Sequence, residues 1–296
     1  MSNMSELLSE LAEGVASGAL IPYLGPGVLQ GVVDRNTGAP IPADSDSLIL
    51  AMNKGRPMAP RLMWEFPRAA MDVELKRGRG AVTRFLDATY GEGSRWTRAP
   101  VHDWLKALRP RYVIDINRDT QLQDAYAEVP HTLVRGIARM GGTDYRFRIH
   151  HYDGSAYREV VQAQVDTSLP VLFKPMGSPH PDATYIASDA DYVDYITELM
   201  GGFAIPDFLK RYRRNRQYLF LGLRLLRDTE RMVLSDMVYS AGVPTGFALI
   251  ADPSDKERRF CRNKGIDILE AELEDLLGAA GFVAEDLLGA VREVGC

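Results

Sequence analysis

Cysteine is scarce in this chain: only Cys261 and the last residue, Cys296, occur among 296 residues. Two cysteines cannot supply a four-cysteine zinc ribbon, and they give no disulfide framework. Such scarcity is typical of proteins in a reducing compartment, so we expect a cytoplasmic protein without zinc. The polar, acidic segment 1–13 lacks the basic and apolar regions of a secretory signal and predicts the same location.

The chain also lacks a net basic charge and a long apolar run. Its formal net charge is −5, so we expect no general attraction to nucleic acid or to an anionic membrane surface. No apolar run reaches the roughly 20 residues that span a bilayer. Hydrophobic residues still make up 46% of the sequence, which predicts a soluble globular protein with a substantial core.

Short apolar segments that predict β-strands alternate with helical patterns along the chain. The predicted strands are residues 20–24, 112–116, 169–173, 218–221, 246–251 and 266–268. Buried strands separated by helices are typical of a parallel sheet that is covered on both faces. We therefore expect one Rossmann-like α/β domain over residues 1–296. Within it we expect a helical insert at 54–108 and a β-hairpin at 144–166, where residues alternate around Asp153-Gly154.

Glycine or polar residues follow four of these predicted strands. They are Gly25 to Gly27, Asn117 to Asp119, Gly177-Ser178, and Gly222. In parallel sheets, ligands bind beyond the carboxyl ends of the strands, and glycine lets the backbone lie against a ligand. The pattern predicts a site for a phosphate-bearing molecule at this edge. A single glycine turn is equally typical of an ordinary strand-to-loop connection.

Six segments, in order along the chain, are similar to motifs of one known family. Residues 24–28, Leu-Gly-Pro-Gly-Val, resemble its first glycine turn, and residues 38–42 resemble the Gly-Ile-Pro stretch that follows. Residues 113–119 resemble a strand that ends in Thr-x-Asn-x-Asp. Residues 173–178, Phe-Lys-Pro-Met-Gly-Ser, resemble a Lys-Leu-His-Gly stretch.

The last two segments are similar to the end of the same family's pattern. Residues 218–228 resemble a late Phe-Leu-Gly-Tyr-Ser-Leu-Arg-Asp motif, and residues 247–253 resemble the strand after it. The pattern is that of the sirtuin-like NAD-binding family, in the short bacterial branch that lacks the zinc ribbon.

The resemblance implies that NAD or ADP-ribose lies across the first glycine turn and over the Asn/Asp motif. Asn117 is then expected to orient a water or a ribose hydroxyl, and Asp119 to bond the nicotinamide amide or hold its loop. Both residues also suit a turn that caps a helix. The ligand-binding residues expected from the resemblance are Gly25, Pro26, Gly27, Val28, Asn117, Asp119, Gly177, Ser178, Gly222 and Arg224.

The expected ligand edge departs from the family at several positions. Met176 stands where the family has its histidine general base, and a thioether has no proton to exchange near neutral pH. His180 is a candidate replacement, although a surface-loop position is the other interpretation. Pro26 removes a backbone N–H. Arg224 replaces a serine, and it suits either a phosphate contact or a structural ion pair.

Three functions follow from this combination of matches and departures. The first is a sirtuin-like protein that binds NAD or ADP-ribose with weak or no turnover, as a sensor or a regulatory subunit. The second is an NAD-consuming hydrolase or ADP-ribosyl-type enzyme of bacterial defence that uses Asn117 and a rearranged base such as His180. The third is a scaffold subunit that binds no nucleotide. In each case we expect a homo-oligomer or a protein partner.

Overall fold

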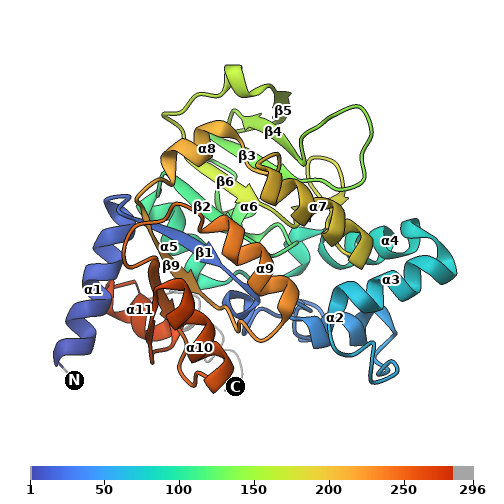
Figure 1. The fold of residues 1–296 in the computed structure, drawn as a ribbon, viewed down its shortest axis with the longest axis horizontal. Coiled ribbons are helices and arrows are strands. Elements are labelled where there is room, and N and C mark those ends of the chain that lie inside the picture. Colours follow the sequence, from blue (N-terminus) through green and yellow to red (C-terminus); the bar gives the residue numbers. More distant parts are fainter. Residues whose placement is uncertain (1, 283–296) are drawn as a thin grey trace, which may run out of the picture.

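The computed structural model describes residues 2–282 and contains a nine-stranded sheet (Figure 1). The strand order is β11-β10-β9-β1-β2-β6-β3-β4-β5. A second, two-stranded antiparallel sheet pairs β7 (Gly177–Ser178) with β8 (Thr184–Tyr185). The predicted Rossmann-like α/β fold is confirmed.

All six predicted strands occur, and they pair in parallel with one another. They are β1 (Leu20–Leu24), β2 (Tyr112–Asp115), β6 (Val171–Lys174), β9 (Gln217–Leu221), β10 (Gly246–Leu249) and β11 (Ile266–Leu269). The register sets Leu24 beside Asp115 on one side and beside Leu221 on the other. The carboxyl ends of β1, β2 and β9 therefore lie next to one another.

Three further strands widen the sheet beyond the predicted set. They are β3 (His131–Gly136), β4 (Phe147–Tyr152) and β5 (Tyr157–Val160). Strands β4 and β5 form a hairpin in the predicted region, but they continue the main sheet through antiparallel pairing with β3. The sequence did not predict β3 because His131, Thr132 and Arg135 interrupt its apolar pattern, although all three are buried.

Helices cover both faces of the sheet (Figure 1). On one face the core includes residues of α1 (Ser2–Ala16), α5 (Pro100–Leu108), α6 (Gln121–Ala125) and α11 (Leu273–Ala279). The other face carries α7 (Asp189–Gly201), α8 (Asp207–Tyr212), α9 (Asp228–Met237) and α10 (Asp255–Lys264). The helix α10 was not predicted from the sequence. Helix α11 follows β11 along the chain.

The alternation of side chains along β1 explains these two cores. Leu20 and Leu24 pack in the first core, whereas Ile21 and Tyr23 pack in the second. Successive residues of a strand point to opposite faces, so a fully buried strand needs apolar residues at every position. All five residues of β1 are buried, as this geometry requires.

The remaining helices gather at one end of the molecule (Figure 1). They are α2 (Ser45–Met52), α3 (Phe66–Arg77) and α4 (Arg79–Tyr90). Short 3₁₀ helices occur elsewhere in the chain, at Pro26–Leu29, Gly93–Arg95 and Gln162–Gln164. The predicted segment 54–108 thus contains α3 and α4, and also α5, which packs against α6. We refer to residues 45–67, from the start of α2 to the start of α3, as the covering segment.

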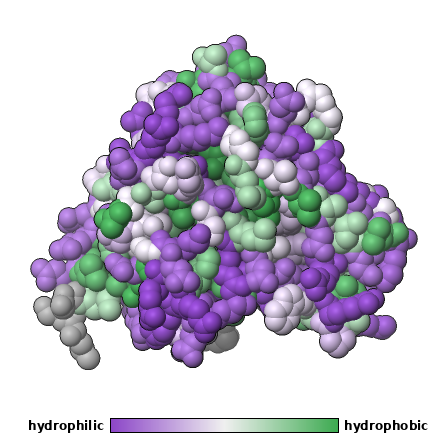
Figure 2. All heavy atoms as spheres, in the orientation of Figure 1, coloured by the Kyte–Doolittle hydropathy of each residue, from purple (hydrophilic) through white to green (hydrophobic). Residues whose placement is uncertain are grey.

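The surface of the protein is mostly hydrophilic on the face shown in Figure 2, with hydrophobic residues toward the middle of the view. Within residues 2–282, no helix combines the length and the apolar character that crossing a membrane requires.

Two glycine loops meet where the strand order reverses, between β1 and β9. The N–H of Gly25 donates to the carbonyl oxygen of Leu221, and the N–H of Gly27 donates to that of Gly222, both at 2.8 Å. A Cβ at Gly27 would lie 2.8 Å from the Cα of Gly222. Gly222 itself has a φ of +67°, and a Cβ there would overlap the backbone nitrogen of Val28. Glycine at these positions lets the two loops pack directly on each other.

This packing makes Gly222 more sensitive to substitution than other glycines of positive φ. Gly38 is the matched control, since its φ is +70° and a Cβ there would meet nothing within 4 Å. Both Gly→Ala variants lose stability because alanine disfavours the left-handed backbone conformation. Only Gly222→Ala also creates a steric overlap, which costs about 1–3 kcal/mol of the free energy of unfolding. We expect chemical denaturation to show that additional loss for Gly222→Ala. Equal losses in the two variants would contradict the described packing.

Candidate functional site

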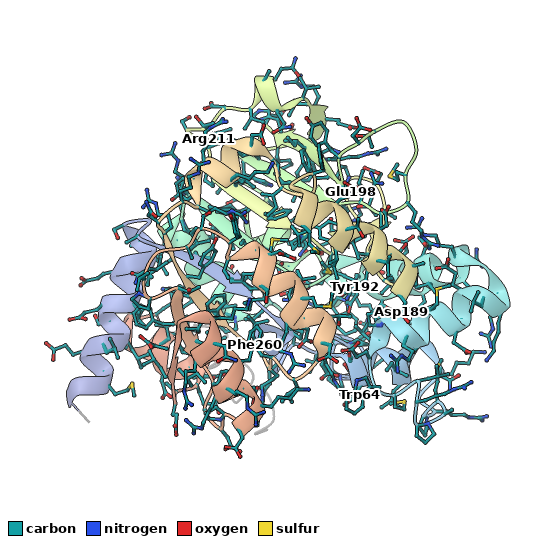
Figure 3. All side chains as sticks on the ribbon, viewed as in Figure 1. Trp64, Asp189, Tyr192, Glu198, Arg211 and Phe260 are labelled. Atoms are coloured by element: carbon teal, nitrogen blue, oxygen red, sulfur yellow. The ribbon has the colours of Figure 1, made fainter. Side chains whose placement is uncertain are left out.

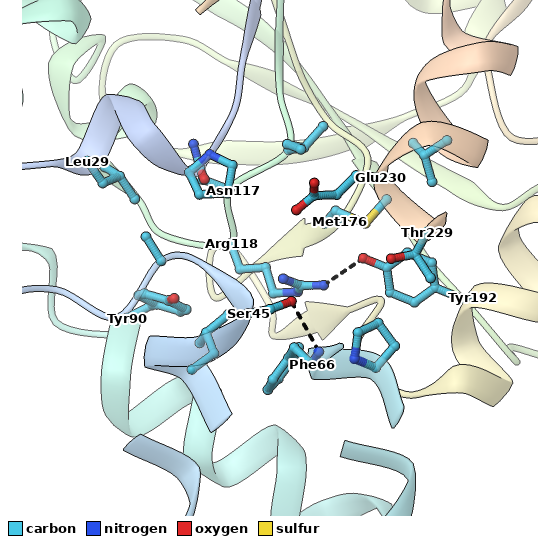
Figure 4. A pocket seen from close by; sticks show the side chains of 16 residues that line it. Leu29, Ser45, Phe66, Tyr90, Asn117, Arg118, Met176, Tyr192, Thr229 and Glu230 are labelled. Atoms are coloured by element: carbon cyan, nitrogen blue, oxygen red, sulfur yellow. Dashed lines mark hydrogen bonds between the residues drawn. The ribbon is translucent and has the colours of Figure 1, made fainter. Parts of the chain in front are cut away.

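A cavity lies at the carboxyl edge of the sheet, between the strand ends and the covering segment (Figure 4). Its volume of about 50 Å³ accommodates a few water molecules. The residues that line it come from the loops after β1, β2 and β6, from the covering segment, and from α4, α7 and α9. They are Pro26, Leu29, Ala43, Ser45, Leu48, Phe66, Pro67, Tyr90, Ile116, Asn117, Arg118, Met176, Tyr192, Thr229, Glu230 and Val233.

Asn117 is the predicted site residue that the structure places most firmly in this cavity. Its Nδ2 donates to the carbonyl oxygen of Gly25 at 3.0 Å and to Oδ1 of Asp115 at 2.9 Å. Its backbone N–H also donates to Asp115 Oδ1. No hydrogen bond to its Oδ1 occurs within residues 2–282, so this acceptor is open to a ligand or a water in the cavity.

A buried ion pair lies beneath Asn117. Lys174 Nζ, at the end of β6, is 2.5 Å from Asp115 Oδ2 at the end of β2, and both side chains are fully buried. Charges removed from water are stable only when they are paired and hydrogen-bonded. Asp115 meets this requirement through Lys174 and Asn117. The pair therefore fixes the spacing of the two strand ends and the orientation of the Asn117 amide.

Arg118 brings a positive charge to the same cavity, and it is 8% exposed. Its Nε and one terminal nitrogen donate to the carbonyl oxygen of Ile186 at 3.0 and 2.6 Å. The same terminal nitrogen donates to the hydroxyl of Tyr192 at 3.1 Å (Figure 4). Tyr192 lies on α7 (Figure 3). The guanidinium lies over the ring of Phe66, 5.3 Å from its centroid.

Glu230, in the first turn of α9, adds a carboxyl group to the cavity (Figure 4). Burial raises its pKa to about 7, and the neighbouring Glu65 adds to the rise while Arg227 opposes it. A carboxyl group with this pKa is able to hold or release a proton near neutral pH. Groups with such shifted pKa values are common in functional sites.

The covering segment is fastened over the cavity by polar contacts. Glu65, which is 6% exposed, accepts hydrogen bonds from the N–H groups of Asp228 and Thr229 at 2.6 and 3.4 Å. A carboxylate at a helix N-terminus is stabilised by the unpaired N–H groups and by the helix dipole. Ser45 Oγ accepts from the N–H of Phe66 at 3.1 Å (Figure 4), which holds α2 against the start of α3.

The first glycine turn directs its N–H groups toward the protein. The N–H of Gly25 donates to Leu221 at the end of β9, the N–H of Gly27 donates to Gly222 in the loop that follows, and the N–H of Val28 donates to the carbonyl oxygen of Gly25 at 3.2 Å. Pro26 has no N–H and lines the cavity with its ring. A phosphate group would have to replace these internal hydrogen bonds to be bound by this turn.

The segment after β6 contributes one residue to the cavity and the next two to the two-stranded sheet. Met176 is 3% exposed and lines the cavity, at the position expected for the family's histidine. Gly177 and Ser178 form β7, and Ser178 Oγ donates to the carbonyl oxygen of His180 at 2.8 Å. His180 is exposed, and its Nε2 lies 3.0 Å from the carbonyl oxygen of Gly91. His180 therefore sits outside the cavity, in a surface loop.

The other predicted ligand residues also have contacts within the protein. Asp119 Oδ1 accepts from the N–H of Gln121 at 2.7 Å, which is a turn ahead of α6, while its buried Oδ2 has no partner within residues 2–282. Burial raises the pKa of Asp119, and the Lys174 ammonium opposes the rise. Arg224 is exposed and donates to Glu257 at 3.1 Å, and it does not line the cavity. Gly222 contacts the first glycine turn instead.

The family pattern described as a SIR2-like domain matches residues 111–269, more than half of the chain. The chain belongs to this family. The match confirms the predicted resemblance, and a search of curated proteins finds no match. The matched segment of this SIR2-like domain begins just before β2 and ends with β11. It includes Asn117, Met176 and Glu230, whereas the first glycine turn and the covering segment precede it.

Three charged residues in or beside the site were not predicted from the sequence: Glu65, Arg118 and Glu230. Arg118 lies inside the quoted Asn-x-Asp motif, so its charge in that position was a visible signal. Glu230 follows the late motif by two residues, and the sequence around it is typical of the first turn of a helix. Glu65 bonds to Asp228, which is 163 residues away in the sequence, so only the fold reveals its position.

Within the described residues, no group of three or more histidine, cysteine, aspartate or glutamate side chains is arranged to hold a metal ion. The polar groups that line the cavity include the amide of Asn117, the guanidinium of Arg118 and the carboxyl group of Glu230, between the aromatic rings and the Met176 thioether.

The buried ion pair provides a first test of this site. Lys174→Met leaves the Asp115 carboxylate buried without its partner, and we expect a loss of about 3–5 kcal/mol in the free energy of unfolding. The double variant Asp115→Asn/Lys174→Met removes both charges, so its loss should be smaller than the sum of the single losses. Urea denaturation of the wild type, both single variants and the double variant measures this coupling. Strictly additive losses would show that the two groups do not interact.

Glu230 provides a second test, through the pH dependence of stability. Its pKa is about 7 when folded and near 4.3 in an unfolded chain, so the folded state keeps a proton that the unfolded state releases. The resulting stability is present at low pH and is lost as the pH rises through about 7. We expect urea denaturation at about pH 5 and about pH 8 to show a smaller decline for Glu230→Gln than for the wild type.

The matched control for this test is Glu6→Gln, which removes a carboxylate from the exposed side of α1. The pKa of Asp119 is also raised, so Asp119 lowers the stability with rising pH in the same way. The free energy of unfolding of Glu230→Gln should therefore still decline with pH, but less than that of the wild type. A decline equal to that of the wild type would mean that Glu230 titrates as an ordinary surface carboxyl group.

Proposed function

We propose that this SIR2-like domain binds NAD or ADP-ribose at the cavity, with weak or no turnover. The observation that supports the proposal is the meeting of Asn117, Arg118 and Glu230 at the carboxyl ends of the parallel strands, beside the reversal of strand order. Ligands bind at this place in open α/β sheets. The open Oδ1 of Asn117 accepts a hydrogen bond from a ribose hydroxyl or a water.

A dinucleotide is far larger than the cavity as it stands, because about 50 Å³ holds only a few waters. We propose that the covering segment moves away from α9 when the ligand binds, which breaks the Glu65 contacts with the N–H groups of Asp228 and Thr229. Residues 1–296 act as one domain that contains the helical insert 54–108, and only the covering segment, residues 45–67, moves as its cover. In the open state, Pro26 and the loops at Gly25 to Val28, Gly177-Ser178 and Gly222 border the ligand.

The proposed weak turnover rests on the residue that replaces the family's histidine. Met176 has no proton to exchange, and no histidine lines the cavity in the described part of the chain. A general base typically contributes about 10²–10⁴-fold to the rate. A protein that holds its nucleotide without consuming it suits a sensor or a regulatory subunit, which acts through a second copy or a partner protein.

A second candidate function, NAD hydrolysis, is favoured by Glu230. Its carboxylate would accept a proton from a water as that water attacks the ribose carbon, while the bond to nicotinamide breaks and nicotinamide leaves with the bonding electron pair. Asn117 would hold the water in place. This candidate keeps the enzyme interpretation but replaces His180 with Glu230 as the base, because His180 lies outside the cavity.

Binding and turnover are separated by two measurements on the same protein. We expect calorimetry to detect heat for NAD and ADP-ribose, and Asn117→Ala to weaken both affinities about tenfold or more, because the amide is held in position by Asp115. His180→Ala is the control outside the cavity and should bind like the wild type. Release of nicotinamide from NAD, followed in parallel, should be slow or undetectable.

Each other outcome identifies a different function. Fast nicotinamide release that is lost in Asn117→Ala and Glu230→Gln would overturn the binding proposal in favour of the hydrolase. Absence of both heat and a thermal shift with NAD and ADP-ribose would favour the scaffold without nucleotide. Thermal unfolding of each variant shows that the protein is still folded.

A further inference from the structure

Arg118 is a buried cation whose hydrogen-bond partners are neutral groups. The structure gives it the Ile186 carbonyl oxygen and the Tyr192 hydroxyl, with the Phe66 ring against its plane. Within residues 2–282, no carboxylate lies within 4.0 Å of its nitrogens. A charge buried without compensation is costly, so this arrangement calls for an anion.

Other buried cations in the protein have their charge compensated. Lys174 pairs with Asp115, and Arg135 pairs with Asp182. Arg213 is 7% exposed and donates only to the carbonyl oxygens of Asp236 and Met237, at the C-terminal end of α9. That end of a helix carries partial negative charge, which stabilises a cation.

The carboxyl groups near the cavity form no ion pair with Arg118: Glu65 accepts from the N–H groups at the start of α9, and Glu230 lies more than 4.0 Å from the Arg118 nitrogens. Ile186 lies three residues before Asp189, where α7 begins, so the guanidinium is near the positive end of that helix. The acidic Asp191 in the first turn of α7 is already paired with Arg79 and Arg139. The open side of Arg118 faces the cavity, where apolar walls such as Met176 and Phe66 strengthen an electrostatic contact.

We infer that Arg118 recognises a negatively charged group of the ligand, a phosphate or a carboxylate, and so determines which ligands this site accepts. A guanidinium binds either anion through a planar pair of hydrogen bonds. The inference rests on the proposal that this cavity binds a ligand, and it adds the requirement that the bound end of that ligand is anionic.

The test compares anionic and neutral probes on a matched set of variants. Arg118→Gln keeps a donor for the Ile186 carbonyl oxygen but removes the charge, and Arg118→Lys keeps the charge but loses the planar pair of donors. Arg213→Gln is the control, since it alters a buried arginine that bonds only to main-chain carbonyls outside the cavity. The probes are NAD, ADP-ribose, inorganic phosphate, nicotinate, nicotinamide and adenosine, measured by calorimetry and thermal shift.

We expect Arg118→Gln to lower the affinity for the anionic probes at least about tenfold, equivalent to about 1.4 kcal/mol. Its affinity for nicotinamide and adenosine should be unchanged. Arg118→Lys should fall between Arg118→Gln and the wild type, and Arg213→Gln should match the wild type. A stronger effect on phosphate than on nicotinate identifies a phosphate group as the recognised anion, and the reverse identifies a carboxylate.

Two results would overturn the inference about Arg118. The first is that Arg118→Gln binds the anionic probes with the same affinity as the wild type. The second is that Arg118→Gln loses the same affinity for anionic and for neutral probes, because Arg118 would then have only a structural role. If the wild type binds phosphate or nicotinate through Arg118 but neither NAD nor ADP-ribose, the proposed function fails while the Arg118 assignment holds. If no anion binds the wild type, both fail.

Discussion

The candidate site depends on the buried contact between Asp115 and Lys174 at the ends of two neighbouring strands. The same carboxylate orders Asn117, whose amide reaches the carbonyl oxygen of Gly25 after a third strand. One side chain thus links the ends of β1, β2 and β6. Asp115 occupies a position where the family pattern has a threonine, so this departure from the pattern has a structural role in this chain.

The fold was predictable wherever burial determines the sequence. Strands such as β1 lie between two helical layers and need apolar residues at every position, which makes them visible in the sequence. The strand β3 was missed because its His131 and Arg135 are buried through polar contacts with residues distant in sequence, among them Tyr157 and Asp182. Local patterns contain no information about partners of that kind.

The site was predictable only in part, for the same reason. Asn117 and Met176 follow predicted strands, and both line the cavity. The glycines were expected to admit a ligand, whereas their close approach in this structure is between the two loops themselves. Glu65 and Glu230 became visible only once the covering segment and α9 were placed side by side, since no local spacing relates residues so far apart.

The carboxylate of Glu65 at the start of α9 has a consequence for which anions can bind at this helix N-terminus. A group tethered to the same chain is present there at high effective concentration, so stray ions in solution compete poorly with it. The Glu65 carboxylate therefore disfavours the binding of a free phosphate ion at the N-terminus of α9. A ligand that binds as proposed would have to displace the Glu65 carboxylate from these N–H groups, so ligand binding and movement of the covering segment would form one linked equilibrium.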